Sequence, residues 1–126
     1  YDTDAAGILY FADQFRFVQD TVEAFFESIG HPIAEMVATG DIILPAVRAE
    51  TDYFKSLKAG MRIKVTVQVE RLKTTAMILS FEITGEDGSL YGRARMVYVF
   101  VRRGGGGKCP IPQEIRLALE PFLMTG

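Results

Sequence analysis

The sequence predicts an α+β protein in which one long helix packs on an antiparallel β-sheet. An apolar stripe with helical spacing lies near the start of the chain, and segments that alternate apolar and polar residues follow it. In addition, 126 residues with 48% hydrophobic and 24% charged side chains suit one soluble globular domain. Because a sheet with one apolar face must bury that face, the helix is expected to cover it.

The long helix is predicted over residues 11–29. Its apolar residues recur every three or four positions, which places them on one helix face. They are Phe11, Phe15, Val18, Val22, Phe25, Phe26 and Ile29. Gly30 and Pro32 indicate the end of this helix, because glycine adopts the left-handed cap and proline cannot continue a helix. Shorter helices are expected over residues 33–39 and 111–120.

Four strands are predicted between the second and the last helix. Residues 62–70 and 77–83 alternate apolar and polar side chains, as strands with one buried face do. An earlier strand is expected across residues 42–54. The strand over 89–101 ends in an apolar run, so we expect it to be central or buried at an interface. Residues 85–88 indicate a hairpin turn between the last two strands, which suits antiparallel pairing.

The charge balance and the cysteine content argue against several classes of protein. Fourteen basic and sixteen acidic residues give a net charge of -2, whereas nonspecific nucleic-acid binding relies on clustered positive charge. No run approaches the roughly 18 apolar residues of a membrane span. Cys109 is the only cysteine, which excludes an intrachain disulfide and a Cys-rich zinc site and favours the reducing cytoplasm.

The single histidine, His31, is expected to be a surface or cap residue. A nucleophilic pair would need it as a base, and nothing in the sequence places Ser28 or Cys109 beside it. No cluster of His, Cys and carboxylates has the spacing of a metal site, so we expect no metal. The glycine run over 104–107 lacks the Lys-Ser/Thr of a phosphate-binding loop and is expected to be a flexible loop.

The opening segment, from Tyr1 to Phe11, is the strongest candidate for chemistry. Asp2 and Asp4 precede small residues and Gly7, and the predicted helix starts directly afterwards. A helix N-terminus offers unpaired N–H groups and a partial positive charge. A carboxylate beside it would supply the nucleophile or base of an acyl-transfer site, and the N–H groups would supply the oxyanion donor. A turn capped by one of the two aspartates is an equally good interpretation.

The same segment, Asp2-Thr3-Asp4-Ala5-Ala6-Gly7-Ile8-Leu9-Tyr10-Phe11, resembles the signature of the 4-hydroxybenzoyl-CoA thioesterase-like branch of the hotdog-fold superfamily. The resemblance covers most of the chain and continues through Leu44–Val47, the pair Tyr53 and Phe54, and Gly60. Two further stretches, Gly40–Pro45 and Cys109–Pro112, are similar to the dihydroxynaphthoyl-CoA hydrolases within that branch.

This resemblance implies a fold in which a curved antiparallel sheet wraps around one long helix. It also implies a homodimer or homotetramer with active sites at the subunit interface. Five strands are usual in the family and four are predicted here, so we expect the first strand to precede Tyr1, which is not a methionine. Residues 1–126 are accordingly expected to form a single hotdog domain.

The resemblance also assigns roles to individual residues. Asp4 matches the catalytic carboxylate, which acts as nucleophile or general base. Phe11 matches the position whose backbone N–H binds the thioester oxygen. Arg71 and Lys73 match basic positions that contact the nucleotide phosphates of coenzyme A, and a solvated hairpin is the equally weighted alternative for them.

The implied function is hydrolysis of an acyl-CoA thioester without a metal or organic cofactor, with an aromatic or a short aliphatic acyl group. The expected partners are the acyl-CoA and further copies of the chain, in the cytoplasm. Two other functions stay open. A hotdog dehydratase or hydratase generally uses a histidine with an acid, which His31 outside the motif disfavours. A noncatalytic acyl-CoA-binding module is disfavoured by the intact Asp4.

Overall fold

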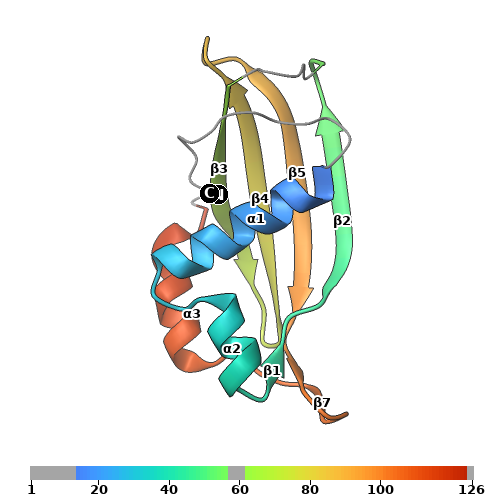
Figure 1. Cartoon of the computed structure of the whole chain (residues 1–126), viewed down its shortest axis with the longest axis vertical. Coiled ribbons are helices and arrows are strands. Elements are labelled where there is room, and N and C mark those ends of the chain that lie inside the picture. Colours follow the sequence, from blue (N-terminus) through green and yellow to red (C-terminus); the bar gives the residue numbers. More distant parts are fainter. Residues whose placement is uncertain (1–13, 57–61, 125–126) are drawn as a thin grey trace.

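A four-stranded antiparallel sheet with one long helix across it dominates the computed structural model of the chain (Figure 1). The structure describes residues 14–56 and 62–124. The strands lie in the order β2-β5-β4-β3. Their bounds are Ala46–Tyr53 for β2, Ile63–Leu72 for β3, Ala76–Gly85 for β4 and Leu90–Val99 for β5. The predicted α+β class is confirmed.

Helix α1, Gln14–Ser28, lies across one face of this sheet (Figure 1). Val22 and Phe26 are completely buried against the strands, and Val18, Phe25 and Ile29 are packed against the same core. The predicted apolar stripe is therefore confirmed for these residues. The remaining members of the stripe lie outside the described residues or have side chains that are not described. Gly30 has a φ of 86°, which is the left-handed conformation expected at the helix end.

The strands bury the face that α1 covers and expose polar groups on the other. Alternate residues of β3, β4 and β5 form the core under the helix, as the period of two requires. The most buried of them include Val65, Val69, Met77, Leu79, Phe81, Ile83, Ala94 and Tyr98. Burying a Val, Leu, Ile, Phe or Met side chain in this way contributes roughly 1.5–3 kcal/mol. The central position of β5, between β2 and β4, agrees with its predicted apolar run.

A second sheet of three short strands lies at one end of the first, where the sequence predicted only longer strands and a loop. Its strands are β1 (Ile42–Ile43), β6 (Val101–Arg102) and β7 (Gly107–Lys108). The predicted strand 42–54 is interrupted at Pro45, because proline has no N–H for a ladder. The predicted strand 89–101 is interrupted at Phe100, whose N–H donates instead to the carbonyl of Thr75.

The glycine run predicted as a loop forms the turn between β6 and β7. Gly104, Gly105 and Gly107 have φ values of 82°, 88° and 76°, which L-residues with side chains rarely adopt. Glycine at these positions therefore allows the chain to reverse direction between β6 and β7.

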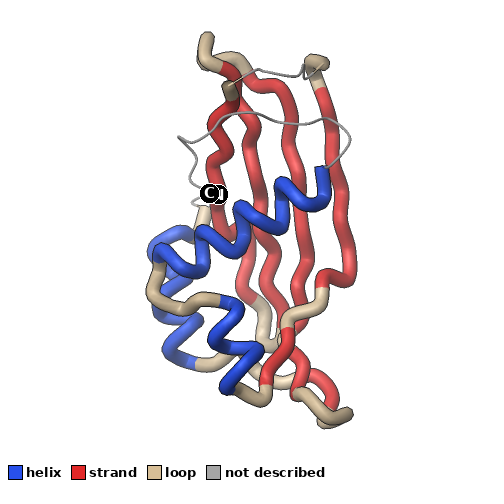
Figure 2. The backbone as a smooth tube through the Cα atoms, in the orientation of Figure 1, coloured by secondary structure: helices blue, strands red, loops and turns tan. Residues whose placement is uncertain are grey.

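Two short helices, α2 (Ile33–Thr39) and α3 (Gln113–Leu119), lie beside one another at the end of the sheet that carries the β6–β7 hairpin (Figure 2). Helix α3 begins after Pro112, two residues later than predicted, and a 3-10 turn (Glu120–Phe122) follows it. The ring of Phe122 packs edge-on against Phe25, with centroids 5.1 Å apart.

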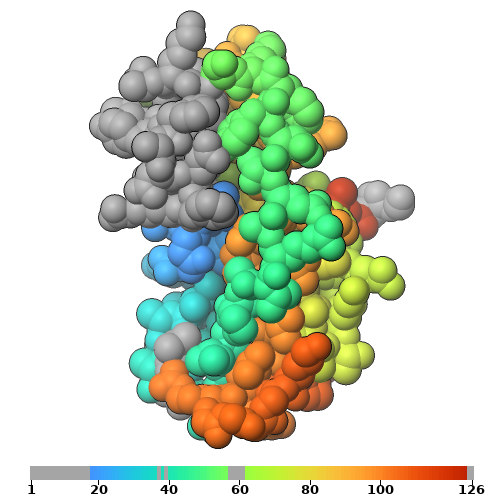
Figure 3. All heavy atoms as spheres, turned by 90° about the vertical axis from the view of Figure 1, so that its right-hand side faces the viewer, coloured from blue at the N-terminus to red at the C-terminus, as the bar shows by residue number. Residues whose placement is uncertain are grey.

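Strand β2 is an exposed edge of the four-stranded sheet. All eight of its residues are exposed, and it runs as a green band along the face of the molecule turned to the viewer in Figure 3. Within the described residues it pairs only with β5, which makes it an edge strand. No helix in the described part of the chain is long and apolar enough to span a membrane.

Candidate functional site

The predicted catalytic residues, Asp4 and Phe11, lie outside the described residues, as does the whole motif between them. The structure describes the helix that follows the motif, from Gln14 onward. Of the predicted site residues, Arg71 and Lys73 are described.

Arg71 and Lys73 lie at the end of β3, on the face of the sheet opposite to α1. Leu72 between them packs against the core, so its two neighbours point the other way. Both basic residues are exposed; Arg71 belongs to β3, and Lys73 directly follows Leu72, the last residue of that strand. Arg71 pairs across the ladder with Ile78, and the Lys73 N–H donates to the carbonyl of Ala76 at 2.8 Å.

The acidic residue nearest to these cations in the sequence is Glu70, which lies at a β-bulge and binds other residues. The register between β3 and β4 shifts between Val69 and Arg71, which leaves Glu70 as the extra residue. The Glu70 carboxylate accepts hydrogen bonds from Arg95 on β5, at 3.0 and 3.1 Å from its Nε, and from Ser80 at 2.8 Å. Arg71 is therefore not neutralised by its neighbour in the sequence.

The turn that carries Lys73 is held by the C-terminal part of the chain. The carbonyl of Lys73 accepts a hydrogen bond from the Arg116 guanidinium on α3. The carbonyl of Thr74 accepts one from the Ile111 N–H at 2.9 Å, and that of Thr75 accepts one from the Phe100 N–H at 2.8 Å. Three successive carbonyls are thus bound by donors that are distant in the sequence, and the backbone at Lys73 is fixed. The sequence offered no local signal for Arg116.

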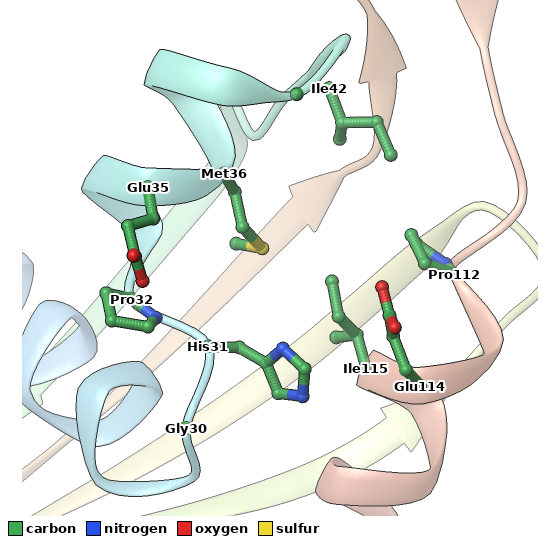
Figure 4. Close-up of a pocket in the computed structure, with 10 residues that line it drawn as sticks. Gly30, His31, Pro32, Glu35, Met36, Ile42, Pro112, Glu114 and Ile115 are labelled. Carbon is green, nitrogen blue, oxygen red and sulfur yellow. The ribbon is translucent and has the colours of Figure 1, made fainter.

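A cavity of about 380 Å³ lies between α2 and α3, and His31 contributes to its wall (Figure 4). The imidazole points into the cavity, which Glu35 and Glu114 also line. Cys109 is buried and does not line it, and the Ser28 hydroxyl donates to the carbonyl of Phe25 at 2.6 Å. Neither Ser28 nor Cys109 therefore pairs with His31, and the noncatalytic role of His31 stays a prediction.

Metal ligation finds no support in the described residues either. No group of three or more His, Cys, Asp or Glu side chains in residues 14–56 and 62–124 could hold a metal ion. The chemistry that these residues offer is electrostatic: two exposed cations on a fixed turn, suited to an anion.

Comparisons with known proteins point to a single class. The Thioesterase-like superfamily matches residues 1–119 of the chain. A 1,4-dihydroxy-2-naphthoyl-CoA hydrolase of Thermosynechococcus vestitus is 28% identical over 114 residues, which are 90% of this chain and 78% of that protein. The corresponding hydrolase of Rippkaea orientalis is 28% identical over 116 residues, which are 90% of this chain and 84% of that protein.

A solved structure is similar in fold as well as in sequence. The crystal structure of a 1,4-dihydroxy-2-naphthoyl-CoA thioesterase from Synechocystis superposes with a TM-score of 0.80 and 27% identity, covering 94% of this chain and 87% of that one. Fold and family together define a thioester hydrolase with the hotdog fold. The chain belongs to the Thioesterase-like superfamily, as its opening motif predicted.

Proposed function

We propose that this protein hydrolyses the thioester bond of an aromatic acyl-CoA. The observation that carries the proposal is the similarity to 1,4-dihydroxy-2-naphthoyl-CoA hydrolases over 90% of the chain. The family match also includes the Asp2–Phe11 motif, from which an acyl-transfer site was predicted. A bicyclic aromatic acyl group is the first substrate class to test, and short aliphatic acyl groups are the second.

In this proposal Asp4 supplies the reactive carboxylate. As a nucleophile, its oxygen attacks the thioester carbonyl, the carbon–sulfur bond breaks with release of the CoA thiolate, and water hydrolyses the resulting anhydride. As a general base, it takes a proton from water, the hydroxide adds to the carbonyl, and the thiolate leaves. The Phe11 N–H donates to the carbonyl oxygen as negative charge develops on it.

Arg71 and Lys73 are proposed to bind the nucleotide phosphates of the coenzyme. Their exposure and their lack of carboxylate partners in the described part of the chain support this role, because a phosphate group needs available cations. The bulge that turns Glu70 towards Arg95 contributes to their availability.

We further propose that the protein is a homodimer or homotetramer in the cytoplasm. Strand β2 is an edge of the four-stranded sheet within the described residues, and a second copy could extend the sheet at this edge. An unpaired cysteine is compatible with a reducing compartment.

A thiol-release assay across a panel of acyl-CoAs tests the proposed function. We expect the highest kcat/KM for hydroxylated aromatic acyl-CoAs and a lower value for acetyl-CoA. Release of no thiol from any acyl-CoA, with retained binding of the coenzyme, would favour the noncatalytic module instead. Addition of water to an enoyl-CoA without thiol release would favour the hydratase.

A further inference from the structure

The β3–β4 turn is held by backbone groups and by the side chain of Arg116. Of the three carbonyls from Lys73 to Thr75, two are bound by the N–H groups of Ile111 and Phe100. The carbonyl of Lys73 is bound by the guanidinium of Arg116, which is 43 residues away in the sequence. Arg116 is half-buried on α3, so its position is determined by the packing of that helix.

Three cationic residues, Arg71, Lys73 and Arg116, lie at this end of the sheet. In the described part of the chain, Arg71, Lys73 and Arg116 form no ion pair with a carboxylate. A hydrogen bond from a guanidinium to a carbonyl leaves the positive charge in place, because the carbonyl is neutral. A charged side chain is thus used to hold the backbone of a second cationic residue.

We propose that Arg116 is a positioning residue of the coenzyme A nucleotide site, acting through the Lys73 carbonyl. It restricts the turn to one conformation, so that less conformational freedom is lost when a phosphate group binds Lys73 and Arg71. The inference rests on the proposed function, because it takes the phosphates of the coenzyme as the anion. It does not require that the protein hydrolyse any thioester.

Calorimetric titration with coenzyme A and with adenosine 3′,5′-bisphosphate tests this role. We expect Arg116→Gln to weaken both affinities about five- to tenfold, because a charged donor is lost from the turn. Arg116→Lys should recover part of the affinity. Lys64→Gln is the matched control, since Lys64 is an exposed cation on the opposite face to α1 at the far end of β3, and it should change neither affinity.

Kinetics and a double substitution separate positioning from a general structural effect. Arg116→Gln should raise KM for benzoyl-CoA and leave kcat unchanged. It should leave kcat/KM unchanged for S-benzoyl-pantetheine, which lacks the nucleotide. In a Lys73→Gln background, Arg116→Gln should weaken coenzyme binding no more than about twofold, because the two residues act together.

These measurements test the role of Arg116 separately from the proposed hydrolysis. Equal losses on both benzoyl thioesters, an unchanged coenzyme affinity, or fully independent effects of Lys73→Gln and Arg116→Gln would overturn the role of Arg116. The same holds if the parent protein binds neither coenzyme A nor the bisphosphate. If the parent binds coenzyme A and releases no thiol from any acyl-CoA, the proposed function fails, while the titrations still decide the role of Arg116.

Discussion

Glu70 on β3 and Arg95 on β5 form a two-point ion pair that spans the strand between them. The Arg95 Nε lies 3.0 and 3.1 Å from the two carboxylate oxygens, and Ser80 of β4 donates to the same carboxylate at 2.8 Å. The bulge at Glu70 makes this contact possible, because Glu70 is the extra residue and has no partner residue on β4. The hydrogen bond from Arg95 lowers the pKa of Glu70, and that from Ser80 lowers it further.

The first prediction concerns the pH dependence of stability. Since the pKa of Glu70 in the folded protein lies below its ordinary value of 4.5, its contribution is present above pH 4.5. That contribution is lost as the pH falls through the lowered value. Glu70→Gln should therefore reduce the free energy of unfolding by about 0.5–1 kcal/mol at pH 7, since the pair is partly exposed to solvent. Urea titrations at pH 7 and pH 3 should show this difference shrinking in acid.

The control for this prediction is Glu82→Gln. Glu82 pairs with Arg93 at 3.3 Å through a single, more exposed contact, so its loss should cost less. A difference between the parent and Glu70→Gln that is the same at both pH values would contradict the linkage.

The second prediction concerns catalysis. Asp4→Asn should reduce kcat for the best acyl-CoA by at least about 10²-fold, because the amide can act neither as a base nor as an anionic nucleophile. Coenzyme A affinity and the melting temperature should change little, since the two side chains have similar size. Asp2→Asn is the paired control and should retain more activity. Turnover by Asp4→Asn within a few-fold of the parent would rule out the carboxylate mechanism and favour a turn.

The third prediction concerns assembly at the edge of β2. The Phe54 N–H donates to the Tyr91 carbonyl of the neighbouring strand. Because N–H directions alternate along a strand, that of Thr51 points away from β5. Thr51→Pro should therefore remove an outward donor without breaking the β2–β5 ladder, whereas Thr51→Ala keeps the N–H. Light scattering should give at least twice the 14.0 kDa of one chain for the parent and the alanine variant.

For Thr51→Pro we expect a larger share of 14.0 kDa species on dilution. Circular dichroism should confirm that its sheet content is preserved. A parent protein that is monomeric at micromolar concentration would exclude the proposed assembly, and an unchanged mass of a folded proline variant would place the interface elsewhere.

The fourth prediction concerns a buried hydroxyl. Tyr98 is 2% exposed, and its Oη has no hydrogen-bond partner among the described residues. Desolvation raises the pKa of Tyr98 to about 12. Because the phenol is kept neutral in the folded protein but ionises above pH 10 once unfolded, the parent should lose up to about 1.4 kcal/mol per pH unit between these values. Tyr98→Phe should lack this loss.

At neutral pH, Tyr98→Phe should be as stable as the parent or more stable by about 1 kcal/mol, since an unpaired buried hydroxyl is removed. Tyr98→Ala should instead cost about 3–5 kcal/mol, because it leaves a cavity in the hydrophobic core. Denaturant titrations at pH 8, 10.5 and 11.5 measure all three proteins. A clear loss of stability in Tyr98→Phe at pH 8 would show that the hydroxyl has a partner.

The sequence predicted the elements whose signal is periodic. The stripe that includes Val22 and Phe26 predicted α1, and the alternation along β3 and β4 predicted their buried faces. The prediction from sequence was wrong where long-range hydrogen bonds compete with the local pattern of apolar residues. Phe100 continues an apolar run, yet its N–H and C=O bind Thr75 and Cys109, so the strand is interrupted there. Pro45 was a visible signal for the break between β1 and β2.

The same distinction between local pattern and long-range contacts applies to the candidate site. The residue types and spacing of the Asp2–Phe11 motif left an acyl-transfer site and a capped turn equally open. The resemblance of that motif to a known signature predicted the family, which the family match over residues 1–119 confirms. Only the tertiary structure decided that Glu70 turns to Arg95, that Arg71 and Lys73 lack acidic partners among the described residues, and that Arg116 holds the turn between them and β4. These contacts join residues 25 and 43 positions apart, and such contacts depend on strand register and helix docking rather than on any local pattern.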